Sequence, residues 1–216
     1  GQGTRKASKT LGALAWDDFE LYRGVTPESR FQLGGIGGEG TVTLDQLDRR
    51  RSLLQQIEDA HRAVGTDGPG FGADRHRETA YRLLQSPAFR QAFDLDQESW
   101  DTRALYGMNL FGQAALTARR LVEAGGRFVS VFWDEYGLAG TGWDTHWDHF
   151  PRMKDELLPG LDQTLSGLIL DLDRRGMLDE TLVVLLSEHG RTPQIGNVQG
   201  GGRDHWSRCY SILMAG

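Results

Sequence analysis

The spacing of apolar and polar positions changes character near the middle of the chain. Between Thr43 and residue 124 the apolar residues recur at helical intervals, which predicts helices beginning near 43, over about 74–93 and over about 109–124. Ser86-Pro87 is expected to restart the second of these, because Ser suits the N-cap and Pro the first helical turn. Residues 1–41 hold nine glycines and few apolar runs, which predicts a loop-like segment ahead of one domain over 42–216.

The second half of the chain alternates short apolar runs with one long amphipathic pattern. "RFVSVFW" (127–133), "TLVVLL" (181–186) and "CYSILM" (209–214) are typical of buried strands, and about 151–175 is typical of an amphipathic helix. A strand, a helix and a second strand at this spacing predict a right-handed βαβ unit. We therefore expect an α/β fold with a mainly parallel sheet over about 127–216, beside a helical part over about 43–124.

Charge, cysteine content and hydropathy narrow the classes of protein to consider. The net charge of -6 argues against a nucleic-acid-binding protein that works by neutralising phosphates. One cysteine, Cys209, excludes an intramolecular disulfide and a multi-cysteine metal site. No stretch reaches the roughly 18 apolar residues of a membrane-spanning helix.

Carboxylates and histidines gather where two of the predicted strands end. Ligands of open α/β sheets bind beyond the carboxyl ends of the strands, so these groups should meet at one edge. A glycine-rich loop over 196–202 is long enough to bring a third acid–histidine pair to the same place. The six expected metal ligands are Asp144 and His146 after the first strand, Glu188 and His189 after the second, and Asp204 and His205 after the loop.

Carboxylate oxygens and imidazole nitrogens without a thiolate suit one or two divalent ions. Zinc, manganese and iron fit such a set, and a carboxylate-rich site also accepts magnesium or calcium; zinc, manganese and calcium are favoured here. Mixed ligands on loops are typical of open catalytic sites. Arg191 and Arg203 are candidate substrate-binding residues that could clamp an oxyanion, with a carboxylate partner or plain solvent as the alternative.

Less specific interpretations stay open for several of these residues. Asp204 and His205 could pair within their loop, with Trp206 packing beneath them. Asp148 and His149 could face solvent or begin the long helix. The Gly200–Gly202 run could be only a flexible loop, or could let the backbone approach an anion.

Long stretches of the chain resemble a bacterial family called domain of unknown function 1501. They are "RRSLLQQIEDA", "GQAALTARRLVEAGGRFVSVFW", "WDTH", "LLPGLDQTLSGLILDLDRRGMLDETLVVLLSEHGRTP" and "GGRDHWSRCYSILMAG". The resemblance covers about residues 42–216, and the last hundred residues are its specific part. That family in turn resembles the alkaline phosphatase and sulfatase superfamily, which implies a three-layer α/β/α core with a two-metal hydrolytic site.

The resemblance also assigns roles to individual residues. "SEHG" is similar to the superfamily's acid-His-Gly segment, with Glu188 and His189 as ligands, although the family often has Phe at the position of His189. Asp144 and His146 match "WDTH", and Asp204 and His205 match "GRDHW". The superfamily's nucleophile comes from an N-terminal strand–turn–helix that residues 1–41 do not resemble, so the catalytic nucleophile is unassigned and we expect the chain to be a piece of a longer protein.

The function implied by this resemblance is metal-dependent hydrolysis of phosphate or sulfate esters on a small molecule or a glycan. The rival is a non-catalytic protein that binds carbohydrate or a protein partner with the same fold. A third possibility is an interaction module organised by helices over 43–124. Members of the family often carry a twin-arginine signal, which implies an exported, periplasmic bacterial protein.

Overall fold

The computed structural model describes residues 44–63, 71–133 and 143–216. The expectation for residues 1–41 lies outside these described residues. Those that are described fall into two compact units, a smaller one that ends at Leu95 and a larger one that runs from Asp96 to Gly216. None of the helices in the described ranges is long and apolar enough to cross a membrane.

The smaller unit is helical, as the apolar spacing predicted. Ser86 caps the third helix, because its Oγ accepts a hydrogen bond from the backbone N–H of Phe89 at 3.3 Å. Arg51 joins the first two helices through both carboxylate oxygens of Glu78, at 2.7 and 2.8 Å. The helices are α3 (Leu44–Ala63), α4 (Phe71–Gln85) and α5 (Pro87–Ala92).

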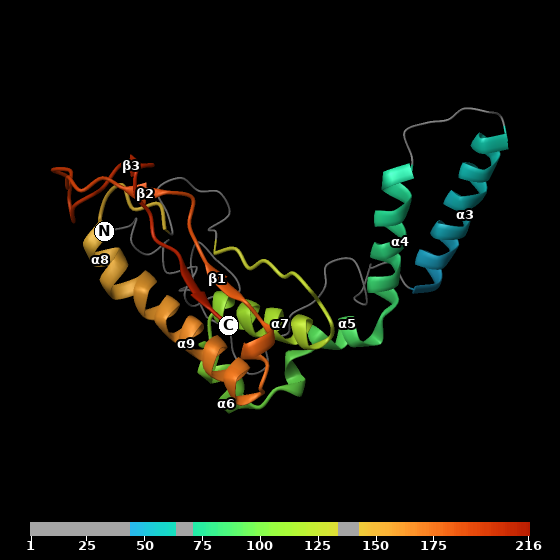
Figure 1. The fold of residues 1–216 in the computed structure, drawn as a ribbon, viewed down its shortest axis with the longest axis horizontal. Helices are drawn as coiled ribbons and strands as arrows, with labels where there is room; N and C mark the ends of the chain where they lie inside the picture. Colours follow the sequence, from blue (N-terminus) through green and yellow to red (C-terminus); the bar gives the residue numbers. More distant parts are fainter. Residues whose placement is uncertain (1–43, 64–70, 134–142) are drawn as a thin grey trace, which may run out of the picture. The chain divides into compact units, whose positions relative to one another are not determined.

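The larger unit is built on helices that pack closely against one another (Figure 1). Ser99 and Asn109 cap two of them, each accepting a hydrogen bond from a backbone N–H three residues on. A π-helical turn joins α8 to α9, so the helix expected over 151–175 is confirmed with an irregular start. The elements are η1 (Leu95–Gln97), α6 (Trp100–Tyr106), α7 (Leu110–Glu123), α8 (His149–Arg152), η2 (Met153–Leu157), α9 (Leu158–Arg174) and η3 (Leu178–Glu180).

Small residues let α9 approach α6 closely. A Cβ at Gly167 would lie 2.6 Å from the carbonyl oxygen of Leu105, a distance that no real side chain tolerates. Three residues earlier, the buried Thr164 hydroxyl donates to the carbonyl of Tyr106 at 3.0 Å. The buried positions of α9 are therefore mostly small or polar, with Leu172 as the buried leucine, in place of a continuous leucine stripe.

A buried charged network lies where α6, α7 and α9 meet. Arg119 has no exposed side-chain surface, and its guanidinium lies 2.8 Å from Glu98 and 2.9 Å from Asp171. The Nε contact with Asp171 is ionic, without the alignment of a hydrogen bond. Burial together with Asp171 raises the pKa of Tyr106, so its phenol keeps its proton and donates to Asp171 at 2.8 Å. Burial alone would raise the pKa of Glu98, but hydrogen bonds from Arg119 and Arg120 outweigh it and lower that pKa.

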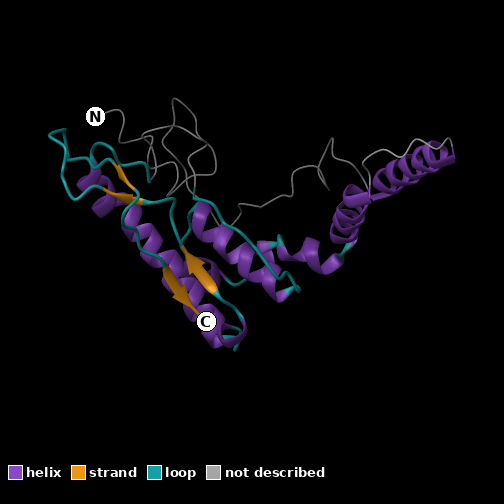
Figure 2. Ribbon diagram, turned by 45° about the horizontal axis from the view of Figure 1, so that its top comes forward, coloured by secondary structure: helices purple, strands orange, loops and turns teal. Residues whose placement is uncertain are grey.

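The expected three-layer α/β/α fold with a mainly parallel sheet is wrong. The larger unit carries two small antiparallel sheets in which β1 pairs with β4 and β2 pairs with β3 (Figure 2). The apolar runs at 181–186 and 209–214 do contribute strands, shorter than expected, but they run in opposite directions. The strands are β1 (Val183–Leu185), β2 (Gly190–Arg191), β3 (His205–Trp206) and β4 (Leu213–Ala215).

The apolar run at 127–133 is extended but pairs with no strand among the described residues. Its side chains alternate, with Val129 and Val131 partly covered while Phe128 and Phe132 remain 89% and 84% exposed. Trp133 packs between Phe111 and Trp143, with ring centroids 4.2 and 5.1 Å away. A period-2 pattern specifies an extended backbone, but pairing requires a neighbouring strand edge, and none of the described segments supplies one.

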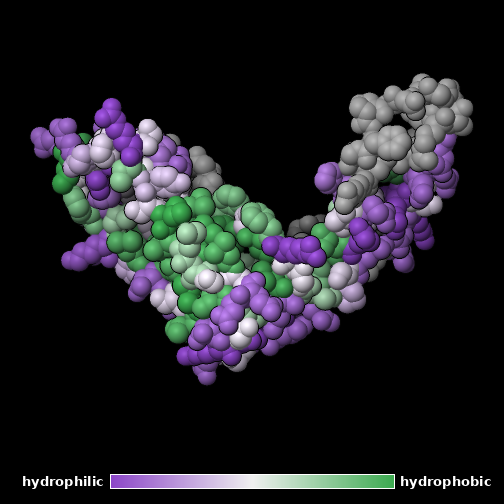
Figure 3. All heavy atoms as spheres, viewed as in Figure 1, coloured by the Kyte–Doolittle hydropathy of each residue, from purple (hydrophilic) through white to green (hydrophobic). Residues whose placement is uncertain are grey.

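Apolar side chains also remain exposed on the β1–β4 sheet, where buried strands were expected. Figure 3 shows hydrophobic surface gathered over the middle of the larger unit. The most exposed of these side chains on or beside the two strands are Leu182, Leu186, Leu213 and Met214. Two strands bury only one another's backbone edges, so apolar side chains stay exposed on both faces of this sheet.

Candidate functional site

Three segments distant in sequence meet at one end of the larger unit. The β2–β3 hairpin opposes Arg191 to His205, and Gly190 to Trp206. Gly190 is required at this point, because a Cβ there would collide with the carbonyl oxygen of Cys209. The segment before α8 lies against the same hairpin and contributes Asp144 and His146. The backbone thereby brings three of the expected acid–histidine segments together without a parallel sheet.

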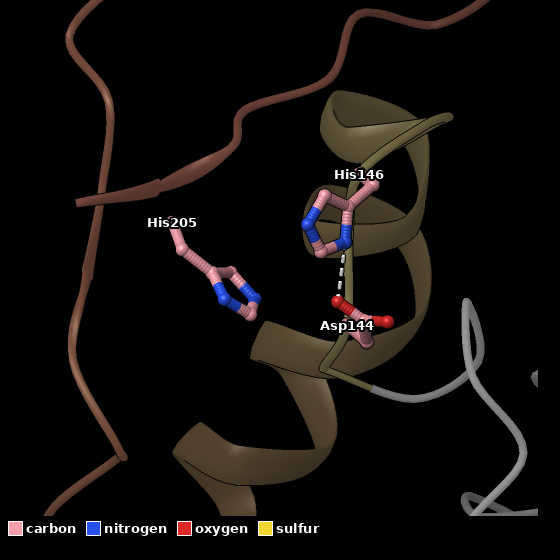
Figure 4. Close-up of side chains that lie close together, drawn as sticks. All are labelled: Asp144, His146 and His205. Atoms are coloured by element: carbon pink, nitrogen blue, oxygen red, sulfur yellow. Dashed lines mark ion pairs between the residues drawn. The ribbon is translucent and has the colours of Figure 1, made fainter.

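Asp144, His146 and His205 form the first group of potential metal ligands (Figure 4). One potential ligand atom from each residue lies within 4.8 Å of the others. His146 Nδ1 is 2.5 Å from Asp144 Oδ1, and the His146 and His205 ring centroids are 4.8 Å apart. The carboxylate and the two imidazoles belong to partly exposed or exposed residues, so a small ion or a water molecule can reach them.

Glu188, His189 and His205 form the second group, by the same 4.8 Å criterion. Glu188 Oε1 lies 3.4 Å from Nε2 of His189 and 3.4 Å from Nε2 of His205. The rings of His189 and His205 meet edge to face at 4.3 Å between centroids. His205 is therefore common to both groups and stands between the other two imidazoles.

Asp204 belongs to neither group, although the sequence pattern predicted it as a sixth ligand. Adjacent residues of an extended chain point to opposite sides, and His205 already points toward the cluster. The backbone of Asp204 pairs with Thr192, accepting from its N–H at 2.8 Å and donating to its hydroxyl at 3.2 Å. The carboxylate nearest the His205 ring is that of Glu188, so His205 pairs across the cluster instead of with its neighbour in the loop.

Arg191 and Arg203 lie in the hairpin, where each side chain binds the other's main chain. Arg191 Nη1 donates to the carbonyl of Arg203 at 3.1 Å, and Arg203 Nη2 donates to the carbonyl of Arg191 at 3.3 Å. Arg203 Nε also donates to the carbonyl of Thr192 at 2.5 Å. Arg191 Nη2 takes Asp144 Oδ1 as its partner at 3.0 Å. Of the two interpretations for Arg191, the carboxylate partner is the arrangement present here, while a role for either arginine in substrate binding stays a prediction.

The glycine-rich loop holds the start of α8. The backbone N–H groups of Asp148, His149 and Phe150 donate to the carbonyls of Gln199, Gly201 and Gly200 at 2.9, 3.0 and 3.2 Å. These N–H groups would otherwise be unsatisfied at a helix N-terminus, so the loop caps the helix. His149 thus begins the helix, which was one of its two interpretations.

His149 sits beside the cluster without belonging to it. Its Nδ1 lies 2.8 Å from the hydroxyl of Thr145. Partial burial lowers the pKa of His149, and the positive charges of Arg203, Arg191 and Arg152 lower it further. His149 is therefore held neutral near neutral pH, which spares the cluster another positive charge.

We predict that Gly202→Ala separates the two sides of the site. Gly202 is buried, and a Cβ there would collide with the carbonyl oxygen of His146. Relieving the collision must shift the loop that leads to His205, at a cost of about 1–3 kcal/mol in the free energy of unfolding. Urea denaturation followed by tryptophan fluorescence measures the loss, and zinc titration measures the effect on the site.

Gly196→Ala is the matched control within the same loop. A Cβ at Gly196 would meet only the carbonyl oxygen of Gly202, at an ordinary 3.5 Å. If the two variants were equally stable and bound zinc equally well, the close approach of Gly202 to the His146 carbonyl would not matter for the site.

The donor set fits a small divalent ion. Zinc bonds to nitrogen and oxygen of about 2.0–2.2 Å place tetrahedral ligand atoms about 3.3 Å apart, so the ligand atoms of each group, which now lie within 4.8 Å of one another, need only modest shifts to bind one ion. Both groups offer imidazole and carboxylate without thiolate, a set that suits zinc or manganese. His146, His189 and His205 with Glu188 and Asp144 are the residues that would hold it.

The fold and this cluster define a mainly helical protein with a histidine–carboxylate centre at a loop-built end of the domain. The family model described as "Protein of unknown function (DUF1501)" matches residues 20–216, and the chain belongs to that family. Searches of curated proteins and of solved structures found no match.

Proposed function

We propose that this protein is a divalent-metal-dependent hydrolase of phosphate or sulfate esters carried by a small molecule or a glycan. The observation that supports the proposal most directly is the position of His205, which completes both groups of potential ligands. Two further imidazoles and two carboxylates, from two other chain segments, gather around it. Collecting such donors at one place is the arrangement that a divalent cation requires.

The residues of the cluster suit this chemistry in their donor atoms and exposure. A divalent ion held here would supply a water of lowered pKa and neutralise charge on the ester oxygens. Asp144 orients His146 through the 2.5 Å contact with Nδ1, which leaves Nε2 directed away from the carboxylate. Glu188 is 64% exposed at its side chain and lies within reach of two imidazoles, where it can accept a proton from a nearby water. The similarity of "SEHG" to the acid-His-Gly segment of a hydrolase superfamily supports the same reaction.

The proposal predicts turnover of an aryl phosphate or an aryl sulfate that depends on metal. A chelator such as EDTA should abolish the release of the phenol, and adding zinc or manganese should restore it. The measurement is the initial rate with the longest available form of the protein, in parallel for the two esters.

A protein without metal-dependent turnover of either ester would favour the rival, a non-catalytic protein that binds carbohydrate or a partner. If the protein bound metal but hydrolysed neither ester, the metal centre would stand and the proposed hydrolase activity would be wrong.

A further inference from the structure

The hydrogen-bond pattern around His146 defines which of its nitrogens carries the proton. Nδ1 lies 2.5 Å from Asp144 Oδ1, a contact that requires a proton on Nδ1, so Nδ1–H donates to Asp144. Arg191 Nη1 lies 3.1 Å from Nε2 and 3.3 Å from Nδ1 of His146. Because it is almost equally far from the two ring nitrogens, this end of the guanidinium lies over the face of the imidazole and not along the lone pair of either nitrogen. Nε2 therefore keeps its lone pair.

Arg191 thus contacts two of the residues that a metal ion would use. Its Nη2 binds Asp144 Oδ1 at 3.0 Å, and its Nη1 lies against the His146 ring. The side chain of Arg191 is 17% exposed, so this pairing is partly shielded from water. Glu188, the carboxylate of the second group, lies beside His189 and His205 instead.

We propose that Arg191 is a built-in cation which holds the Asp144–His146 pair until a divalent ion replaces it, and which then binds an oxyanion of the ester. The inference rests on the proposed function and specifies how the metal and the substrate are linked. A divalent ion that binds Asp144 Oδ1 competes with the guanidinium for that oxygen and repels its positive charge, so binding of the ion releases the arginine.

The released side chain stays beside the site because its backbone does not move. Arg191 lies in β2 directly opposite His205, and both of its neighbouring carbonyl contacts are to the hairpin itself. A planar guanidinium with paired donors matches the geometry of a phosphate or sulfate oxygen pair. Arg203 is less suited to this task, because its Nε and Nη2 already donate to backbone carbonyls. The structure therefore favours Arg191 as the anion-binding residue of the loaded site.

The test is to measure two affinities by calorimetry in the full chain, that for zinc and that of the zinc-loaded protein for inorganic phosphate. Arg191→Met removes the competing cation and the anion donor together. We expect zinc to bind about tenfold more tightly and phosphate about tenfold more weakly, the scale of one charge-assisted hydrogen bond. Arg191→Lys keeps a charge without the planar fork, so it should lower phosphate affinity with a smaller gain for zinc.

Arg208→Met is the matched control, because Arg208 is exposed and lies outside both ligand groups. It should leave both affinities unchanged. Opposite changes in the two affinities of Arg191→Met support the proposal, whereas a purely structural arginine would weaken both. Equal zinc affinity in wild type and Arg191→Met overturns this inference alone. Failure of every variant to bind zinc overturns the inference and the metal centre of the proposed function together.

Discussion

Arg119→Met is expected to lower the free energy of unfolding by about 3–5 kcal/mol, the range found when one partner of a buried ion pair is removed. Arg119 is buried completely, and it holds Glu98 and Asp171, each of which has only 9% of its side chain exposed. Methionine fills much of the same volume but leaves two carboxylates without their shared cation. The loss should appear as a lower midpoint in urea denaturation followed by tryptophan fluorescence.

The network around Arg119 explains why the expected loss exceeds that of an ordinary ion pair. Hydrogen bonding and charge from Glu98 raise the pKa of Arg119 even though burial alone would lower it. Arg120 also binds Glu98, and Arg175 lies 2.9 Å from Asp171 and 3.5 Å from Glu98, but Arg175 is 32% exposed. Of these three arginines, only Arg119 contacts both carboxylates with no exposed side-chain surface. Arg174→Met is the control, since Arg174 is exposed and its loss should change stability by less than about 0.5 kcal/mol. A change below about 1 kcal/mol for Arg119→Met would mean that the network contributes little, as exposed pairs do.

His205→Ala is expected to remove zinc binding, with affinity falling more than about 100-fold, beyond the range measured for residues that only orient ligands. His205 is the member common to the Asp144–His146 group and the Glu188–His189 group. Its removal therefore leaves two ligands on each side, whereas losing any other single residue leaves one group intact. Calorimetric titration with zinc, and the metal-dependent rate of ester hydrolysis, should fall together.

Asp204→Ala is the control for this prediction, and it separates two descriptions of the site. Sequence pattern places Asp204 among the ligands, while the structure places it outside both groups. An unchanged zinc affinity of Asp204→Ala would support the arrangement in which Asp204 lies outside both ligand groups. A loss in Asp204→Ala equal to that in His205→Ala would instead require a different hairpin arrangement.

The helices were predictable because their signals are local. Ser86 before Pro87 specified a cap, and the Ser86 hydroxyl does accept the Phe89 N–H. The apolar spacing over 109–124 located α7 to within a residue at each end. Helix α6 was missed because seven residues are too short for a periodic pattern, although Ser99 supplied its capping signal. The charged network was missed for a related reason. Sequence pattern alone predicts that Arg119 is exposed to solvent, and its burial follows only from its partners elsewhere in the fold, such as Asp171 on α9.

The sheet was not predictable in the same way. The apolar runs at 127–133 and 181–186 predicted buried strands, but only the second run holds a strand, β1, and none of its three residues is fully buried. Whether strands pair, and in which direction, depends on segments far apart in sequence. β4 returns antiparallel to β1, so a spacing that suggested a parallel βαβ unit did not determine the pairing.

The sequence by itself determined which chemical groups this protein brings to its site, because carboxylate and imidazole pairs are readable residue by residue. The tertiary structure explains the glycines at 190 and 202, since only glycine fits where these two positions meet the backbone carbonyls of Cys209 and His146. Only the tertiary structure decided which of those groups share a space. His205 belongs to both ligand groups and its neighbour Asp204 to neither, and Arg191 reaches Asp144 because the hairpin lies against the segment before α8. Such contacts depend on the direction of a side chain in a folded backbone, a property that sequence spacing does not contain.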